Sequence, residues 1–381
     1  MEGPSRITAV SVATMRVPFF RYSAMFAMFA EEYDKAMRDV LDRGAFILQR
    51  ENQEFEEAFA QYIGVEYAIG VANGTDAMMV ALRAAGVAAG DEVILPSHTY
   101  IATAASVHFV GATPVLVECG SDHLIDPDAV ESAITARTTC IMPVQLNGRT
   151  AAMDRIMAIA DKRGLLVVED AAQGVGSRFN GRSAGTFGDA GTYSFYPAKT
   201  LGSFGDGGAV VTRSHETAQT MSLLRDHGRN ADGRVVAWGI NSRLDNLQAA
   251  ALLVRLGHLD TEIERRRRIA RMYEDGLREI DGLVLPPGPD ADDAHFDVYQ
   301  NYEIESDRRD DLRAHLSERG VGSLIQWNGT PVHQFEALGF DVALPRTDEL
   351  FRRCMLLPMN TMLTDDEVEI VVSEIRSFYG A

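Results

Sequence analysis

Lysine is scarce in this sequence of 381 residues: of its 36 basic residues, three are lysines, Lys35, Lys162 and Lys199, and the others are arginines. Positive charge is also in short supply, because 55 acidic residues bring the formal net charge to -19. A surface with this charge repels the phosphates of nucleic acids and of anionic lipids, so we expect neither as a partner. A lysine in a chain that otherwise uses arginine as its cation indicates that amine chemistry is needed there.

Cysteine and long apolar runs are scarce as well. The three cysteines, Cys119, Cys140 and Cys354, lie far apart without a CxxC pair, which excludes a disulfide framework and a thiolate metal site and favours a reducing, cytoplasmic setting. No run of about eighteen apolar residues is present, so we expect no membrane span. The acidic start and the lack of a clear cleavage pattern in residues 1–20 argue against a signal peptide.

The composition is otherwise that of a globular protein, with 46% hydrophobic and 24% charged residues. The chain is long enough for a large core and two domains. Its histidines do not have the spacing of metal ligands, and we expect no metal site; those considered were His98, His108 and His123.

From about residue 65 the sequence alternates short β-rich segments with helical ones, the pattern of an α/β domain. The strands are apolar runs, which indicates burial on both faces of a mostly parallel sheet. In such a sheet, functional groups gather in the loops at the carboxyl ends of the strands. We predict strands at 66–72, 91–96, 113–118, 138–145, 165–170, 190–196 and 207–212, and helices at 75–86, 99–111, 127–134 and 151–164.

The later part of the chain begins with helical spacing over residues 242–277, which predicts one very long helix or two in tandem. Its run of arginines, 265–268, is interpreted as a solvated helix face paired with neighbouring glutamates. Residues 283–296 are rich in Pro, Gly and Asp and predict a linker or exposed loop. The remainder of the chain resembles a small α+β domain. We therefore predict a large domain over residues 1–255 and a small one over residues 256–381.

The N-terminal segment RYSAMFAMFAEEY, residues 21–33, puts Met and Phe close together. These side chains are common core fillers. We expect the segment to pack on the small domain or against another subunit.

Lys199 lies in the segment GTYSFYPAKTLGSFGDGGAVVT, residues 191–212, five residues after Ser194 and between two predicted strands. A serine hydroxyl for a phosphate and a lysine amine for an aldehyde form the pairing expected for pyridoxal 5'-phosphate (PLP). In NGTDA, residues 73–77, a strand gives way to a helix. Backbone N–H groups there, with the Thr75 hydroxyl, would make a phosphate cradle. The same residues could instead be an ordinary helix cap.

Asp170 and Glu169 end a strongly apolar strand. A carboxylate at the end of a buried strand is costly unless paired, so we expect it to meet a cation or a protonated heterocycle, or else to cap the next helix. Gln173 follows one turn later and could donate to a phenolic oxygen on the same ring. Tyr100 begins a predicted helix, where it could stack on a flat ring or belong to the core.

The order of these segments resembles the DegT-type sugar aminotransferases, members of fold-type I of the PLP enzymes. The resemblance covers about residues 46–270, with a looser match beyond. It is carried by NGTDAMMVALRAAGVAAGDEVILPSHTYIATAASV, VVEDAAQGVGSRFNGRSAGTFGDAGTYSFYPAKTLGSFGDGGAVVT and GINSRLDNLQAAALL. It implies a large domain with a mostly parallel sheet covered by helices, and a small α+β C-terminal domain.

The resemblance also implies a role for each matching residue. Lys199 would hold PLP covalently and Asp170 would pair with its pyridine nitrogen. Gln173 would lie beside the ring hydroxyl and Tyr100 would stack on the ring. The phosphate would be bound by Gly74, Thr75 and Ser194, and by Asn241 of a neighbouring subunit, which implies a homodimer with shared active sites. One departure stands out: where many members have His-x-Tyr-Gly, this chain has QLNG at residues 145–148.

The implied reaction has two halves, in which glutamate gives up its nitrogen and a keto-sugar, linked to a nucleotide, takes it. Such an anionic acceptor needs local cations, for which Arg229, His227 and Arg243 are candidates; each could equally be a surface or structural residue. A cyclic ketone such as a keto-inositol is an alternative acceptor. Relatives that dehydrate deoxysugars have histidine at the position of Lys199, which favours transamination here. A non-catalytic sensor that keeps the fold is the alternative from another class.

Overall fold

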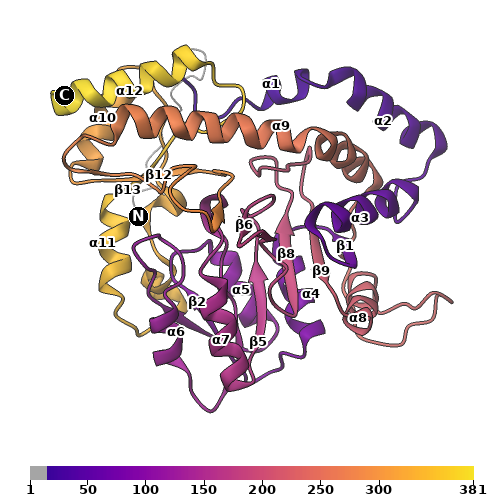
Figure 1. Cartoon of the computed structure of the whole chain (residues 1–381). Helices are drawn as coiled ribbons and strands as arrows, with labels where there is room; N and C mark the ends of the chain where they lie inside the picture. Colours follow the sequence, from indigo (N-terminus) through magenta and orange to yellow (C-terminus); the bar gives the residue numbers. More distant parts are fainter. Residues whose placement is uncertain (1–14) are drawn as a thin grey trace, which may run out of the picture.

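The computed structural model describes residues 15–381 and shows a large α/β unit on which a smaller unit is seated (Figure 1). The large unit is built on a seven-stranded sheet with the strand order β1-β9-β8-β5-β4-β2-β3. Neighbouring strands are parallel except where β9 pairs with β1 and β8. The strands are β1 Tyr67–Val71, β2 Glu92–Pro96, β3 Thr113–Val117, β4 Thr138–Ile141, β5 Leu166–Asp170, β8 Ala190–Ser194 and β9 Gly208–Thr212.

Helices cover both faces of this sheet. In β2, Val93 and Leu95 face one core cluster while Ile94 faces another, so the strand is buried on both sides as its apolar run predicts. The mostly parallel sheet between helices confirms the predicted fold class. The helices of this unit are α2 Ala30–Arg43, α3 Arg50–Ile63, α4 Gly74–Ala85, α5 Ile101–Phe109, α6 Pro127–Ala133, α7 Met153–Arg163 and α8 His215–Arg225.

One helix, α9 Asn246–Leu277, links the two units, as Figure 1 shows. Leu252 and Ile263 in its first part pack in a core cluster of the large unit, whereas Tyr273 and Leu277 pack in the core of the small unit. The prediction that left one or two helices open is thus resolved in favour of one. The proposed boundary between residues 255 and 256 falls inside α9 and stays a prediction.

The small unit is an antiparallel sheet, β10-β12-β13, covered by helices. Its last helix begins with a capping box, in which Thr364 and Glu367 satisfy each other's backbone N–H groups. Its elements are β10 Leu283–Val284, β12 Tyr302–Ser306, α10 Arg309–Glu318, α11 Pro345–Arg353, β13 Cys354–Leu357 and α12 Asp365–Tyr379. A third, small sheet joins β6 Arg178–Phe179 and β7 Arg182–Ser183 to β11 His295–Phe296. Of these three strands, β11 lies inside segment 283–296, for which the sequence predicts a linker or exposed loop.

The arginine run 265–268 differs from its prediction. Arg266 is buried, and its guanidinium donates to the backbone carbonyls of Tyr299 and Met359. Arg265 and Arg268, at the two ends of the run, pair with Asp365 and not with neighbouring glutamates. The run therefore fastens α9 to the small unit, because an arginine can satisfy several carbonyls at once.

The N-terminal segment forms α1 Tyr22–Ala27, which buries none of its residues in this chain. Of residues 21–33, Tyr33 in α2 is the one that is fully buried, and Phe26 stacks on it. No helix among residues 15–381 has the length and apolarity to cross a membrane. The expectation about a signal peptide concerns a segment that lies mostly outside the described residues.

Candidate active site

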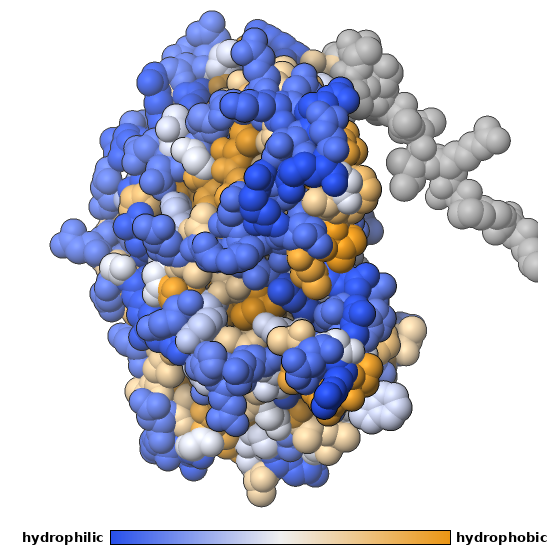
Figure 2. Space-filling model, turned by 90° about the vertical axis from the view of Figure 1, so that its right-hand side faces the viewer, coloured by the Kyte–Doolittle hydropathy of each residue, from blue (hydrophilic) through white to orange (hydrophobic). Residues whose placement is uncertain are grey.

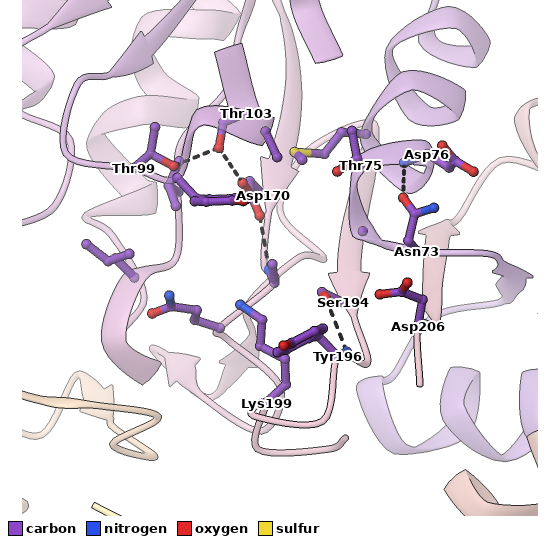
Figure 3. Close-up of a pocket in the computed structure, with 18 of the residues that line it drawn as sticks. Asn73, Thr75, Asp76, Thr99, Thr103, Asp170, Ser194, Tyr196, Lys199 and Asp206 are labelled. Atoms are coloured by element: carbon purple, nitrogen blue, oxygen red, sulfur yellow. Dashed lines mark hydrogen bonds between the residues drawn. The ribbon is translucent and has the colours of Figure 1, made fainter. Parts of the chain in front are cut away.

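A cavity of about 760 Å³ opens at the carboxyl ends of the strands, where the fold predicts a site. The loops that follow β1, β2, β5 and β8 all contribute to it (Figure 3). The small unit adds Trp327. Its lining includes Asn73, Gly74, Thr75, Asp76, Thr99, Tyr100, Thr103, Asp170, Gln173, Ser194, Tyr196, Lys199, Asp206 and Trp327. The sequence thus predicted seven residues that the fold does bring into one cavity.

One side of the cavity is the N-terminus of α4. Asn73 caps this helix by accepting a hydrogen bond of 2.8 Å from the backbone N of Asp76. The N–H groups of Gly74 and Thr75 lie in the first turn, where an α-helix leaves its donors without internal acceptors. A Cβ on Gly74 would lie 2.8 Å from the Cβ of Ser194, so only glycine lets the helix approach β8 this closely. The result is an anion cradle lined by backbone donors and two hydroxyls.

The opposite side of the cavity holds Asp170, at the end of β5. The side chain is 4% exposed and accepts hydrogen bonds from the Thr103 hydroxyl, at 2.8 Å, and from the backbone N of Ala172, at 3.1 Å. Both donors are neutral. Burial raises the pKa of Asp170, and the hydrogen bonds from Thr103 and Ala172, with the nearby Lys199 charge, oppose this only in part. A carboxylate in this state is stabilised by a cationic partner, such as a protonated ring nitrogen.

Lys199 extends into the middle of the cavity, with its amine pointing toward the side where Asp170 lies (Figure 3). The side chain is partly exposed to the cavity but is enclosed by protein. This desolvation lowers the pKa of Lys199, against the attraction of Asp170, and so favours the neutral, nucleophilic amine. The surrounding loop is fixed from outside: the Gln300 carboxamide donates to the carbonyl of Ala198 and accepts from the Thr200 hydroxyl.

Gln173 and Tyr100 also line the cavity. The Gln173 carbonyl oxygen accepts from the backbone N of Asn147, at 2.8 Å, and from the Asn301 side chain, at 3.2 Å. The N–H₂ group of the Gln173 carboxamide has no partner in the described part of the chain and is available to a ligand. The Tyr100 ring is 57% exposed, which places it on the cavity wall and not in the core. A flat, anionic ring compound fits these surroundings.

Glu169, next to Asp170, has a different environment from the one expected. It meets neither a cation nor a heterocycle. Its carboxylate accepts from the Gln145 side chain and from the backbone N–H groups of Gly185, Phe187 and Gly188, at 2.6–3.0 Å. Glu169 therefore fastens a loop on the far side of the strand.

Four predicted residues lie outside the cavity lining, on the segment between α8 and α9. Arg229 and Arg243 both donate to Asp226, at 2.8 and 2.7 Å. His227 and Asn241 are exposed nearby, and Asn241 forms an isolated β-bridge with Asp226. Within one chain, these residues do not join the cradle.

Several lining residues carried no signal in the sequence. Thr103 is one helical turn after Tyr100, and its hydroxyl contacts Asp170; Asp206 and Tyr196 flank the cradle in the lysine loop (Figure 3). Trp327 comes from the small unit, far away in the chain. The one signal available was for Trp327, because the sequence contains only two tryptophans.

A second cavity, of about 260 Å³, continues from the first and shares Gln173, Tyr196, Lys199 and Trp327 with it. It extends toward Phe20 and other residues of the N-terminal segment and the small unit. Lys199 thus lies where two spaces meet.

Histidines do not form a metal centre in the described part of the chain: residues 15–381 contain no group of three or more His, Cys, Asp or Glu side chains arranged to hold a metal ion. His98 and His123 nevertheless lie close together, on either side of Glu303.

Comparison with known proteins agrees with this geometry. The model of the DegT/DnrJ/EryC1/StrS aminotransferase family matches residues 28–376. The chain is 42% identical over 371 residues to the dTDP-3-amino-3,4,6-trideoxy-alpha-D-glucose transaminase of Streptomyces venezuelae, covering 96% of this chain and 97% of that protein. It is 40% identical over 370 residues to the erythromycin biosynthesis sensory transduction protein EryC1 of Saccharopolyspora erythraea, covering 95% and 100%.

Among solved structures, the X-ray crystal structure of S. venezuelae DesV resembles this chain with a TM-score of 0.93 and 41% identity, covering 97% of this chain and 100% of that one. This likeness confirms the fold of the type I PLP aminotransferases. The cavity fits the cofactor of that class. It brings together an anion cradle, the Tyr100 ring on the wall, the buried Asp170 carboxyl group and the Lys199 amine. The chain therefore belongs to the DegT/DnrJ/EryC1/StrS family and is a PLP-dependent aminotransferase.

Proposed function

We propose that this aminotransferase moves an amino group from glutamate to a nucleotide-linked keto-deoxysugar, as a step in amino-sugar biosynthesis. One observation carries the proposal: Lys199, Asp170 and the Gly74 cradle form one cavity, in a chain 42% identical to a transaminase of a dTDP-linked amino-deoxysugar. PLP supplies the chemistry when bound, because its ring accepts the electrons released as the amino group is transferred.

The cradle residues Gly74, Thr75 and Ser194 would bind the cofactor's phosphate, because the helix N-terminus and the two hydroxyls offer donors to an anion. Tyr100 would stack on the ring from the exposed wall. Gln173 would donate to the ring's hydroxyl oxygen with its N–H₂ group, which has no partner among residues 15–381.

Asp170 would hold a proton on the ring nitrogen. Its two hydrogen bonds come from neutral donors, and burial disfavours its isolated charge, so a protonated nitrogen is the partner that makes the ionised carboxylate stable. The protonated ring withdraws electrons better than the neutral ring.

Lys199 would bind the cofactor in the resting enzyme and, once released, move the proton between the substrate carbon and the cofactor. A general base must be unprotonated for part of the cycle. The lowered pKa of its amine supports that role, since desolvation favours the neutral form.

The acceptor sugar is proposed to occupy the second cavity, of about 260 Å³, which begins at Lys199. Neither alternative is favoured by a specific observation. A cyclic ketone would use the same cavity, but the transaminase named above acts on a nucleotide-linked sugar. A sensor would not require the complete set of Lys199, Asp170 and Gln173, although one relative has a sensory name.

We further propose a homodimer in which each chain completes the other's site. The segment between α8 and α9 carries exposed apolar side chains on its returning half: Trp238 is 97% exposed, and Val235 is 70% exposed. Trp238 also borders an apolar groove of about 370 Å³ next to Phe109. Figure 2, which faces the side carrying α1 and α2, shows further hydrophobic patches among hydrophilic residues. Covering these surfaces would stabilise a dimer by removing apolar area from water.

In such a dimer Asn241 would reach the partner's phosphate cradle, and His227, Arg229 and Arg243 would face the anionic acceptor. Mixing two inactive variants tests this arrangement. If Asn241 acts in the partner's site, chains with Lys199→Ala and chains with Asn241→Ala should regain activity when exchanged into mixed dimers, because one of the two sites is then intact. Activity that stays at the level of the separate variants would contradict shared sites.

The direct test of the function is the visible absorption spectrum of the purified protein before and after glutamate is added. We expect a band from lysine-linked PLP that glutamate bleaches, and no such band in Lys199→Ala. Lys162→Ala is the matched control, because that amine is exposed and paired with Glu131. Subsequent addition of a dTDP-linked keto-deoxysugar should restore the band. A protein that takes up no PLP, or whose band does not respond to glutamate, would refute the proposal.

The three cysteines are buried and unpaired, which supports our proposal of a cytoplasmic location.

A further inference from the structure

A buried carboxylate, Glu303 on β12 of the small unit, lies behind the active site. Glu303 is 2% exposed; three side chains from different parts of the chain hydrogen-bond to it, and His98 lies close by. The Asn147 side chain donates to it at 2.9 Å, Gln326 at 2.8 Å and His123 at 2.9 Å, while the His98 ring nitrogen lies 3.7 Å away. Glu303 therefore joins the loops after β2, β3 and β4 of the large unit to the small unit.

Burial alone would raise the pKa of Glu303, but the charge of His98 and the hydrogen bond from His123 hold it well below its ordinary value. The same contact, together with Glu305, raises the pKa of His123 to about 10 even though burial opposes this. Glu303 is thus an anion with no donor of its own, surrounded by groups that can only donate to it.

From Glu303 a chain of side-chain amides runs to the active site. Asn147 gives its N–H₂ end to Glu303, so its oxygen faces the other way and accepts from Asn301, at 2.9 Å, and Gln326, at 3.1 Å. Asn301 also donates to the oxygen of Gln173, at 3.2 Å, and the backbone N of Asn147 donates to the same oxygen at 2.8 Å.

This chain has a fixed direction. A carboxamide has nearly the same shape when its oxygen and nitrogen are exchanged, so shape alone does not orient it. A carboxylate can only accept, which orients the Asn147 side chain. That side chain orients Asn301, and Asn301 donates to the Gln173 oxygen beside the fixed backbone N–H of Asn147. A reversed Gln173 would point its N–H₂ group at two donors, and each unmade hydrogen bond in a buried site is costly.

We propose that Glu303 is a positioning residue for the aminotransferase reaction: through Asn147 and Asn301 it orients the Gln173 carboxamide so that its N–H₂ end faces the ring hydroxyl oxygen of the cofactor. This inference rests on the proposed role of Gln173. It assigns to the small unit a contribution to the site beyond that of Trp327.

The test compares Glu303→Gln with Glu305→Gln. Glu305 lies two residues away on the same strand and also contacts His123, but it touches neither Asn147 nor Gln326. Two readouts other than activity are measured: the dissociation constant of PLP, from titration of cofactor-free protein, and the position of the absorption band. We expect Glu303→Gln to weaken PLP binding by about tenfold, the effect of one misplaced hydrogen bond, and to shift the band. Glu305→Gln should do neither.

A double-mutant cycle separates positioning from a general structural effect. If Glu303 acts through Gln173, Glu303→Gln should cause no further weakening in a Gln173→Ala background. Asn147→Gly provides a second route should Glu303→Gln fold poorly: glycine suits the left-handed backbone at this position, φ 57°, and keeps the N–H that contacts Gln173. It should reproduce the weaker binding and the shifted band.

Additive losses in the cycle, an equal loss in Glu305→Gln, or a folded Asn147→Gly with unchanged binding and spectrum would each overturn the inference. These outcomes are distinct from failure of the proposed function, which is judged by whether glutamate bleaches the band of the unmodified protein.

Discussion

Glu169 and Asp170 are neighbours at the end of β5, but they face opposite sides of the sheet. Their carboxylates differ in how many hydrogen bonds the protein donates to them. Alternate residues of a strand point to opposite faces of the sheet. Glu169 faces the loop 185–188, which gives it three backbone donors, and Gln145 adds a fourth. Asp170 faces the cavity, where Thr103 and Ala172 give it two. Both are buried, and burial raises the pKa of both.

The difference shows how a buried carboxylate can be assigned a role. A carboxylate has about four acceptor sites. Those of Glu169 are filled by protein, so its contribution is to hold a loop in place. Those of Asp170 are only partly filled, and the remainder faces a cavity that fits a ring with a protonated nitrogen. An unfilled, desolvated acceptor is a cost to the empty protein that a ligand can offset.

Glu303, the third buried carboxylate in this comparison, resembles Glu169 in being fully surrounded. Two of its neighbours, however, are histidines. The pKa of Glu303 is lowered, whereas the pKa values of Glu169 and Asp170 are raised. Charged partners stabilise its ionised form. Glu169 and Glu303 thus differ from Asp170 in that protein donors fill their acceptor sites. Glu303 differs from Glu169 in that its partners include charged groups.

The largest effect that would sharpen the comparison is expected for Asp170→Asn. The amide cannot stabilise a protonated ring nitrogen, so kcat should fall by about 10²–10³-fold, as when one preorganised electrostatic contact is removed. PLP occupancy should fall much less, because the phosphate cradle and Lys199 remain. The measurement is single-turnover bleaching of the cofactor band by glutamate, with occupancy determined beside it. If occupancy fell as steeply as the rate, Asp170 would be a binding residue and its contrast with Glu169 would lose its meaning.

The sequence was most informative about residues that follow successive strands of the parallel sheet. Gly74, Tyr100, Asp170 and Lys199 stand in separate segments, yet each comes just after an apolar strand. Because the carboxyl ends of parallel strands meet at one edge, their convergence could be predicted from the strand pattern and the resemblance together. The fold class could be predicted for the same reason, since each strand and helix has its own local signal.

Contacts between the two units had no such signal. The buried Arg266 looked like part of a solvated face, because charge runs usually are solvated and the carbonyls it satisfies lie far along the chain. His98 and His123 were judged by their spacing, although their partner is Glu303. Such contacts depend on how the small unit packs against the large one, and a single sequence carries no local signal for that packing. The role of Asn241 depends on a second chain and stays a prediction.

A smaller effect is expected for Glu169→Gln. This substitution should lower the stability of the protein, whereas Asp170→Asn should lower the rate of the reaction. The new N–H₂ group would face a donor, either the Gln145 amide or a backbone N–H of loop 185–188, and leave it without an acceptor. The cost of such a loss in a buried site is about 2 kcal/mol in the free energy of unfolding. Activity per folded molecule should stay within a few-fold of the original, because the loop lies on the far side of β5 from the cofactor cavity. Denaturant unfolding of both variants, with activity normalised to bound PLP, measures the two effects together. A Glu169→Gln protein of unchanged stability, or one whose normalised rate fell as far as that of Asp170→Asn, would show that filled acceptor sites do not mark a structural carboxylate here.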